Sequence, residues 1–319
     1  MAWTDYRNSS GYPHYHNRDV FIQYLFSGTA SYPPGYTWVT NGISVTVPHP
    51  CPTWNDTCDQ QHPDITLDYA SRTALGRYGA IVVYEDNRDD PWQIYADNIG
   101  ADGSNLWGYD LAVGPYLQQG GNQLDPRIGT TGSAGTPHLG AVVTWRDHRN
   151  AITSDWDIFS QRITQLGARA WTASGLATCT ADGIQRRARI AVRNDLAMIV
   201  WEDLRDSVTT NVDVYGNAIE ARYGTLSWSA ATGGVLSAFD AAQRKPAVDI
   251  TEDEIVVAWE DWRNPEIDDG GEIIPVADIY GHSLRVSDPT QYRWAGDGQP
   301  ITRAKHDQLQ PMVSGTVIV

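Results

Sequence analysis

Three aspartates lie where hydrolytic chemistry would need acidic groups. Asp64, Asp68 and Asp249 fall in short runs that begin near a Gln-x-x-Pro motif, and we expect these runs to be the innermost strands of the fold. Glycoside hydrolysis needs two carboxyl groups about 5–9.5 Å apart whose pKa values differ. These residues are therefore the acids to test for such a reaction. The expected innermost strands also contain Arg127, Arg189 and Arg193, however, and ion pairs between neighbouring sheets are the simpler explanation.

Four tryptophans stand outside the repeated positions of the chain and close to expected loops. An aromatic ring near a loop can stack on a ligand and still offer a polar edge. We therefore regard these four residues as candidate ligand contacts: Trp54, Trp92, Trp156 and Trp262.

One acidic, glycine-rich segment could bind a metal. Asp268, Asp269 and Glu272 surround two glycines and could hold Ca²⁺ through their oxygens, although the spacing is not that of a defined calcium loop. No other cofactor is expected. Cys51 and Cys58 are close enough in sequence for a small-loop disulfide if the protein is exported, which leaves Cys179 single.

A sequence motif that occurs five times, called the phrase below, defines the strands that must position these residues. Its first part is an apolar run followed by Trp-x-Asp-x-Arg, beginning at Trp3, Tyr84, Trp145, Trp201 and Trp259. A strand opening with Asp-Ile-Tyr or a variant follows, then a segment with a lone Trp, then Gln-x-x-Pro-x-Ile. Repeats of this kind must be recognised before the fold is assigned.

The charged residues of the phrase have a structural interpretation. An Arg at the end of one strand could form a bidentate pair with the Asp that opens the next strand, and such a pair would fix each hairpin. Gln93 replaces this Asp once, which argues against five essential ligand sites. The repeat residues are Asp5, Arg7, Asp19, Asp86, Arg88, Asp147, Arg149, Asp157, Asp203, Arg205, Asp213, Asp261, Arg263 and Asp278.

Four short strands per repeat and five repeats predict an all-β, five-bladed β-propeller with four antiparallel strands per blade. We expect a single domain over residues 1–319, with insertions at about 26–59 and at 264–277. The last residues continue into the first as one repeat, Ile318-Val319-Met1-Ala2-Trp3, so one blade should be shared between the termini. A monomer is expected on this basis. The alternative is strand exchange between molecules, which would make the chain a filament subunit.

Charge and hydropathy exclude some partners. Acidic residues number 39 and basic residues 23, so nucleic acid is not an expected partner. No run of eighteen apolar residues occurs, so membrane insertion is not expected. Met1 is not followed by a charged and then an apolar segment, so we do not expect a signal peptide in this chain.

The composite phrase resembles the repeats of secreted bacterial and archaeal cell-surface proteins. The match covers nearly the whole chain outside the two insertions. It implies an extracellular or cell-surface propeller that serves as a non-catalytic binding, adhesion or assembly module, with a protein or glycan as partner. The alternative is a glycan-cleaving or glycan-binding five-bladed propeller.

Overall fold

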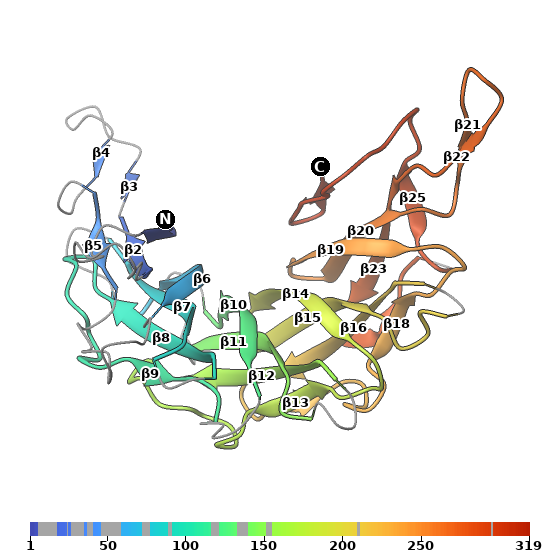
Figure 1. Cartoon of the computed structure of the whole chain (residues 1–319). Coiled ribbons are helices and arrows are strands. Elements are labelled where there is room, and N and C mark those ends of the chain that lie inside the picture. Colours follow the sequence, from blue (N-terminus) through green and yellow to red (C-terminus); the bar gives the residue numbers. More distant parts are fainter. Residues whose placement is uncertain are drawn as a thin grey trace. The chain divides into compact units, whose positions relative to one another are not determined.

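The structure is a computed structural model of the whole chain (Figure 1). It describes residues 1–5, 18–23, 25–26, 35–36, 41–45, 59–71, 77–88, 91–115, 121–132, 140–150, 155–208, 211–294 and 296–319. All regular elements in this described part are β-strands, and their pairing is antiparallel. No helix in the described ranges is long and apolar enough to cross a membrane.

The chain divides into two compact units. Unit 1 comprises Met1–Trp145 and Gln161–Gly175, and unit 2 comprises Arg146–Ser160 and Leu176–Val319. The prediction of a single domain remains a prediction.

The first strands form two small sheets and one four-stranded sheet. The sheet β1-β2-β5 consists of Ala2–Asp5, Asp19–Ile22 and Ile43–Ser44, and β3 (Leu25–Phe26) pairs with β4 (Gly35–Tyr36). The four-stranded sheet consists of β6 (Gln60–Asp68), β7 (Gly79–Asp86), β8 (Gln93–Ile99) and β9 (Leu111–Ala112), in that order.

The next sheet repeats this order with β10 (Gln123–Thr130), β11 (Ala141–Asp147), β12 (Asp157–Ile163) and β13 (Leu176–Cys179). Neighbouring strands in sequence are thus neighbours in the sheet. This meander is the arrangement of a propeller blade, and the prediction of a β-propeller fold is supported.

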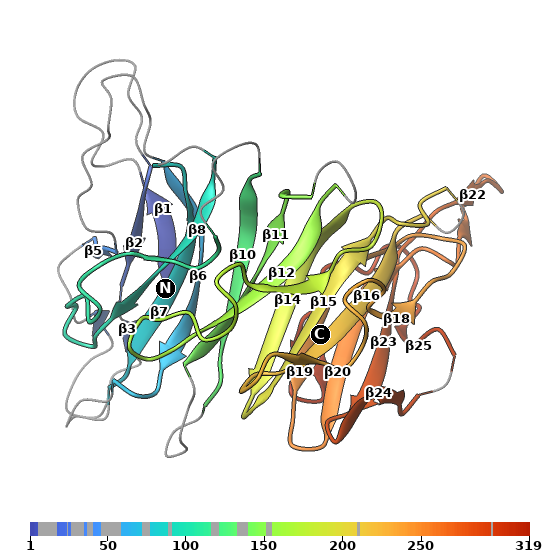
Figure 2. The same cartoon turned by 90° about the horizontal axis from the view of Figure 1, so that it is seen from below.

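Unit 2 contains two larger sheets built on the same meander. The first contains β14 (Gln185–Arg193), β15 (Leu196–Asp203), β16 (Asp213–Glu220), β17 (Thr225–Leu226) and β18 (Gly234–Ser237). The second contains β19 (Gln243–Ile250), β20 (Glu254–Asp261), β23 (Asp278–Arg285), β24 (Asp288–Tyr292) and β25 (Gln299–Thr302). Figure 2 shows the long strands of each sheet side by side.

The apolar runs form these strands because both of their faces are covered. All eight residues of β7 are buried, as are seven of the eight in β15 and in β20. A strand buried on both sides shows a continuous apolar run instead of an alternating pattern. Trp201 and Trp259, at 0% exposure, are among the largest enclosed side chains of unit 2.

The Trp-x-Asp-x-Arg phrase is a local clamp, which corrects one expectation. In unit 2 the Trp201 indole Nε1 donates to Asp203 at 2.9 Å, and Arg205 grips the same carboxylate through Nε and Nη2 at 2.9 and 2.6 Å. Arg205 therefore pairs with the Asp two residues before it, and not with Asp213 at the start of the next strand.

The clamp recurs with Trp259, Asp261 and Arg263, where the corresponding distances are 2.9, 2.8 and 2.6 Å. The next strand contributes an aromatic ring in place of a carboxylate. The guanidinium carbon of Arg205 lies 4.0 Å from the Tyr215 ring centroid, and that of Arg263 lies 4.3 Å from the Tyr280 ring centroid. The strand order brings the ring over the Arg, so the phrase fixes its hairpin by a cation–π contact.

Glycine and glutamine of the repeat also have local roles. Gly233 and Gly298 adopt positive φ angles of 63° and 89°, and a Cβ on either would meet the ring of Trp201 or Trp259 within 3 Å. In unit 1 the Gln60 amide donates to Asp86 at 2.9 Å and accepts from the Val20 backbone at 3.4 Å. The Gln60 side chain therefore bridges the ends of β7 and β2.

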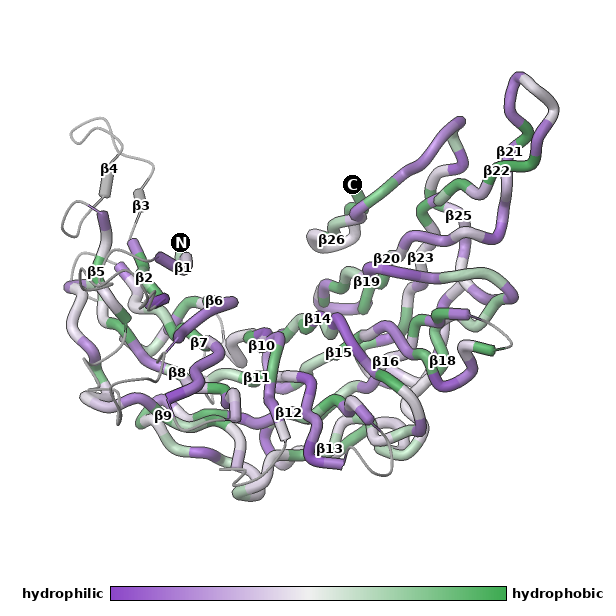
Figure 3. The backbone as a smooth tube through the Cα atoms, viewed as in Figure 1, coloured by the Kyte–Doolittle hydropathy of each residue, from purple (hydrophilic) through white to green (hydrophobic). Residues whose placement is uncertain are grey.

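The second insertion and the last residues of the chain form short hairpins. In the insertion, β21 (Glu266–Ile267) pairs with β22 (Ile273–Ile274), and the hairpin projects from its sheet in Figure 1. At the end, β26 (Val313–Ser314) pairs with β27 (Val317–Ile318), after a largely hydrophilic segment (Figure 3). A blade shared by β27 and β1 remains a prediction.

Candidate functional site

Each long innermost strand begins at the Gln of the repeat and contains a β-bulge at the second residue after it. His62 and Asp125 in unit 1 have φ angles of 49° and 55°, and Arg187 and Lys245 in unit 2 have 53° and 49°. The register shifts at this point in β6, β14 and β19. Positive φ is uncommon for residues other than Gly, although Asn, Asp and His adopt it more often than the rest, and such a conformation persists where surrounding contacts hold it. Bulges of this kind re-aim a side chain and are frequent beside functional sites.

In unit 1 the bulge is held by a buried glutamate. Glu85 follows Tyr84 on β7, and its side chain is 1% exposed. Its Oε1 accepts the Asp125 backbone N–H at 2.7 Å, and its Oε2 accepts the Gln61 amide at 2.8 Å. The His62 ring lies on the same oxygen, with Nδ1 at 3.0 Å. Glu85 thus joins the bulge of its own sheet to the bulge of β10.

In unit 2 the same position carries Glu202 and Glu260. Glu202 is 0% exposed and is gripped by Arg186 Nε at 2.9 Å and Arg187 Nη1 at 3.0 Å, and it accepts the Lys245 backbone N–H at 3.0 Å. Glu260 is 1% exposed and takes Lys245 Nζ at 3.0 Å and the Gln310 backbone N–H at 2.8 Å. Here the buried charges are neutralised by Arg and Lys, as a buried carboxylate requires.

The three aspartates proposed as acids have different surroundings. Asp64 is partly exposed on β6 and accepts the Ile128 backbone N–H at 3.0 Å. Asp249 accepts the N–H groups of Gly315 and Ile250 at 2.7 and 2.8 Å. Asp68 is 2% exposed and accepts from Asn98 at 2.9 Å.

Asp64 and Asp68 do not form a catalytic pair. They are four residues apart on one strand, which is roughly 13 Å at a rise of about 3.3 Å per residue. Because glycosidases need their carboxyl groups about 5–9.5 Å apart, this spacing is too long. The inner strands β6 and β10 of unit 1 begin at Gln60 and Gln123, and we call this end of the strands the Gln end. Two partly exposed acids lie near it, Asp64 and Asp125.

Three of the tryptophan candidates, Trp92, Trp156 and Trp262, lie in the described residues at the Gln end of their strands, each near an arginine. Trp92 accepts the Gln123 backbone N–H at 2.8 Å and lies 6.0 Å from the Arg18 guanidinium. Trp156 stacks on His148 at 4.5 Å, and Trp262 lies 6.0 Å from the Arg244 guanidinium. All three are partly exposed. Trp54, Cys51, Cys58 and Arg7 lie outside the described residues.

The acidic segment of the second insertion is used to build its turn. Asp268 Oδ1 accepts the N–H groups of Gly270 and Glu272 at 2.9 and 2.8 Å. Within the described ranges, a different trio brings three metal-ligating groups together: the ligand atoms of His62, Glu85 and Asp125 all lie within 4.8 Å of one another. The Ca²⁺ prediction for Asp268, Asp269 and Glu272 remains a prediction.

A second group of acids is buried beside the clamp of unit 1. Asp97 accepts Tyr84 Oη at 2.7 Å and Asn105 Nδ2 at 2.6 Å, while Asp110 pairs with Arg88 at 2.6 Å. Burial, and then the negative charge of Asp110, raise the pKa of Asp97 to about 8. Asp97 is 0% exposed, so this group has a structural role in the sheet.

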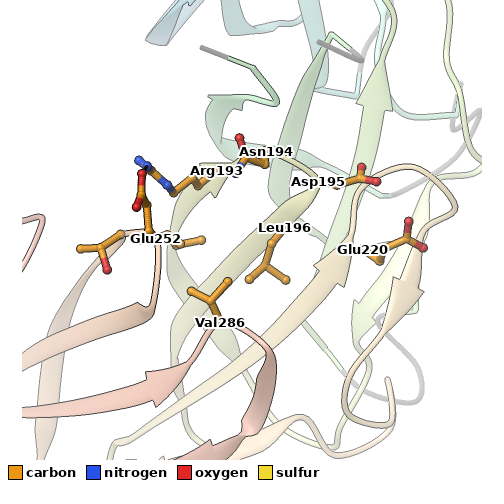
Figure 4. A pocket seen from close by; sticks show the side chains of 9 residues that line it. Arg193, Asn194, Asp195, Leu196, Glu220, Glu252 and Val286 are labelled. Atoms are coloured by element: carbon orange, nitrogen blue, oxygen red, sulfur yellow. Dashed lines mark hydrogen bonds and ion pairs between the residues drawn. The ribbon is translucent and has the colours of Figure 1, made fainter. Parts of the chain in front are cut away.

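Unit 2 also contains a hollow of about 290 Å³ at the other end of β14 from Gln185 (Figure 4). Leu196, Ile250 and Val286 contribute apolar lining. Arg193 and Glu252 form an ion pair of 3.3 Å on one side, and Asp195 and Glu220 lie on the opposite side. Burial, and then the neighbouring Asp195, raise the pKa of Glu220. None of the aspartates and tryptophans predicted as site residues lines this hollow.

Sequence reasoning missed the buried glutamates. The residue between Trp and Asp in the phrase was treated as variable, yet it is Glu where the bulge contains a basic residue or His, as at Glu85, Glu202 and Glu260. It is Arg146 where the bulge residue is Asp125. This exchange of charge between two repeat positions was a signal that could have identified them.

Comparisons of the chain with known proteins found similarity to solved structures, at low sequence identity. No family model and no curated protein matches it. Among solved structures, an α-L-arabinanase of Penicillium chrysogenum complexed with arabinobiose is 13% identical, with a TM-score of 0.40 and coverage of 79% of this chain and 70% of that one. An α-L-arabinofuranosidase of Lactobacillus brevis is 10% identical, with a TM-score of 0.40 and coverage of 97% and 91%. A levansucrase mutant of B. megaterium is 11% identical, with a TM-score of 0.44 and coverage of 93% and 79%.

These comparisons contradict the prediction of a non-catalytic binding, adhesion or assembly module. The similar solved structures named above are an arabinanase, an arabinofuranosidase and a levansucrase. The physical reason for the error is that the repeat was assigned wholly to structure. The repeat does hold the sheets together, but it also gathers ionisable residues at one end of the inner strands.

Proposed function

We propose that the chain is a carbohydrate-active β-propeller that binds and cleaves a glycan at the Gln end of the inner strands of unit 1. The observation that carries the proposal is the meeting of β6 and β10 around Glu85. Two partly exposed carboxylates, Asp64 and Asp125, flank this boundary, and a partly exposed tryptophan, Trp92, lies next to it.

The two flanking acids suit the chemistry of glycoside cleavage. One carboxyl group must donate a proton to the leaving oxygen, and the other must act as base or nucleophile. Asp64 accepts a backbone N–H from Ile128, which holds its carboxylate in a fixed position on β6. We therefore assign Asp64 as the base or nucleophile and Asp125 as the proton donor.

Glu85 is a positioning residue in this scheme. It is enclosed by three donors and is too buried to reach a substrate. Its hydrogen bond to the Asp125 backbone fixes the strained bulge and so the direction of the Asp125 side chain. Preorganisation of this kind is worth most where the catalytic group lies on a rigid strand.

Trp92 supplies a stacking surface beside these acids. Its backbone carbonyl is hydrogen bonded to Gln123, two residues before Asp125. An aromatic face with nearby hydrogen-bonding groups is typical of a site that orients a small ligand. Sugar rings present flat apolar faces and many hydroxyls, which match such a site.

The proposal also includes the finer features predicted from the sequence. We place the protein outside the cell or at its surface, where polymeric glycans are accessible, and we retain the resemblance to secreted surface-protein repeats. We retain the five-blade count and the blade shared between the termini. A monomer of about the chain mass in solution would support this closure, whereas long polymers would favour strand exchange.

A glycan panel tests the function. The wild-type chain should release new reducing ends from at least one polysaccharide, and Asp64→Asn and Asp125→Asn should each lower kcat/KM by 100-fold or more. Trp92→Ala should mainly raise KM, because it removes binding surface and not acid chemistry.

Asp249→Asn in unit 2 is the matched control. Asp249 also accepts a backbone N–H from a neighbouring segment, so a general packing defect would appear in both variants. It should leave kcat/KM within about twofold. Absence of both cleavage and binding across the panel, or equal losses in Asp64→Asn and Asp249→Asn, would refute the proposal.

A further inference from the structure

We infer that His62, Glu85 and Asp125 form a binding site for one divalent transition-metal ion. This inference rests on the proposed function and concerns regulation of the same end of unit 1: an ion on Asp125 keeps that carboxyl group ionised, so the ion-bound chain should lack its proton donor and cleave glycans more slowly. Its test requires no glycan, so each of the two proposals can fail alone.

The first argument is the ligand set. One imidazole nitrogen and two carboxylate oxygens lie within 4.8 Å of one another, close enough for one ion to contact all three. Imidazole suits Zn²⁺ and other transition metals, while carboxylate also suits Mn²⁺. Because the set includes nitrogen, Zn²⁺ or Mn²⁺ should bind more tightly than Ca²⁺, which takes oxygen ligands.

The second argument comes from the repeat. In unit 2 the corresponding glutamates have full cations against them: Arg186 and Arg187 on Glu202, and Lys245 Nζ on Glu260. At Glu85 the corresponding side chains are Gln61 and His62. Glu85 is as buried as the other two, so its charge has the same need for a cation. A metal ion beside His62 would supply it.

The third argument is access. The His62 side chain is 60% exposed, whereas that of Glu85 is 1% exposed. An ion could therefore enter from solvent past the imidazole and reach a ligand that is already fixed. Ligands held by packed strands give more precise metal sites than ligands on loops, and both His62 and Asp125 are held at a bulge.

Binding has a defined proton balance. In the structure His62 Nδ1 faces Glu85 Oε2 at 3.0 Å. An ion bound at Nδ1 requires that this nitrogen carry no proton, so a neutral ring keeps its single proton on Nε2, and only an imidazolium ring releases a proton to solvent. Metal affinity should therefore fall on acidification, because the imidazole must be deprotonated to bind.

Equilibrium dialysis of the intact chain against ZnCl₂, MnCl₂ and CaCl₂ tests the inference. We expect one Zn²⁺ or Mn²⁺ per chain, weaker binding of Ca²⁺, and weaker binding of every ion at low pH. His62→Gln and Asp125→Asn should each weaken binding at least tenfold. Both residues are partly or largely exposed, so these variants should fold, and circular dichroism will verify it.

His148→Gln and Asp249→Asn are matched controls that make the same chemical changes in unit 2. Both should retain wild-type affinity. The inference is overturned if the wild-type chain binds no ion, if His62→Gln and Asp125→Asn bind as tightly as wild type, or if the controls lose affinity equally. Loss of glycan cleavage in Asp64→Asn with unchanged ion binding would separate the catalytic proposal from this one.

Discussion

The sheets β6–β9 and β14–β18 are built from the same repeat, but their side chains form different polar contacts at two repeat positions. In the unit 2 sheet, Trp201 donates to Asp203 and the buried Asn217 accepts the Trp228 N–H at 3.1 Å. In the unit 1 sheet, Tyr84 stands in place of the Trp, and Asp97 in place of the Asn. Its hydroxyl reaches across to Asp97 at 2.7 Å.

The difference teaches that the repeat tolerates exchange only when several positions change together. The unit 2 sheet uses neutral amides and Arg-neutralised glutamate. The unit 1 sheet has acids in both places, with Asp97 beside Asp110 and Glu85 beside His62 and Asp125. A repeat that accumulates acidic groups at the cost of stability is the one to examine for function.

The largest expected effect lies in the clamp of unit 2. Trp201→Ala removes a ring that is 0% exposed and should lower the free energy of unfolding by about 3–5 kcal/mol. Tyr84→Phe keeps the ring in unit 1 and should cost only about 1–3 kcal/mol, because it leaves part of Asp97 unpaired. Urea unfolding measures both. A cost for Tyr84→Phe as large as that of Trp201→Ala would contradict the comparison.

The second largest effect on stability should come from the buried glutamates, and its size should differ between the two units. Glu202→Gln removes the charge that faces Arg186 and Arg187 and should destabilise by about 1–3 kcal/mol. Glu85→Gln should cost less, because within the described part of the chain no Lys or Arg forms an ion pair with Glu85. Chemical unfolding of the two variants at low and high salt would check the order. The opposite order would show that Glu85 relies on a cation in the folded chain even without added metal.

The pH dependence of stability should come from Asp97. Its folded pKa is raised to about 8 from an ordinary value of 3.8, so the folded state binds the extra proton between these values. The free energy of unfolding should therefore fall as pH rises through this window. Asp97→Asn should flatten this part of the profile, measured by thermal unfolding at several pH values. An unchanged slope in Asp97→Asn would place the acid-stabilised group elsewhere.

The smallest effect should be at the hollow of unit 2. Glu252→Gln breaks an ion pair with Arg193, but the Glu252 side chain is 85% exposed. Exposed pairs contribute roughly 0–1 kcal/mol, so the midpoint of thermal unfolding should shift by no more than a degree or two. A large shift would show that the hollow is a structural centre of unit 2.

Much of the fold could be predicted from the sequence because the repeat encodes it. Apolar runs such as Ile255–Ala258 become buried strands, and the strand order within each sheet follows the chain. The partner of Arg263 could not be predicted, because choosing between Asp261 and Asp278 depends on how the chain turns. Both aspartates are close to Arg263 in the sequence. The structure shows that Arg263 donates two hydrogen bonds to Asp261.

The candidate site could be predicted only in part. Asp64 was identified from its place on an inner strand, and Trp92 from its place near a loop. His62, Glu85 and Asp125 were not identified as a group, because 40 residues separate Glu85 from Asp125 and the contact depends on a bulge. Positive φ at a His or an Asp leaves no clear mark in a single sequence.

The central claim is that the Gln end of the inner strands in unit 1 takes a glycan, whereas the corresponding end in unit 2 is structural. Hydrogen exchange with and without a saturating oligosaccharide from the panel tests it most directly. We predict slower exchange in residues 59–64 and 121–128, and unchanged exchange in residues 185–193 and 243–250. Protection confined to the unit 2 segments, or none in either unit, would contradict the account.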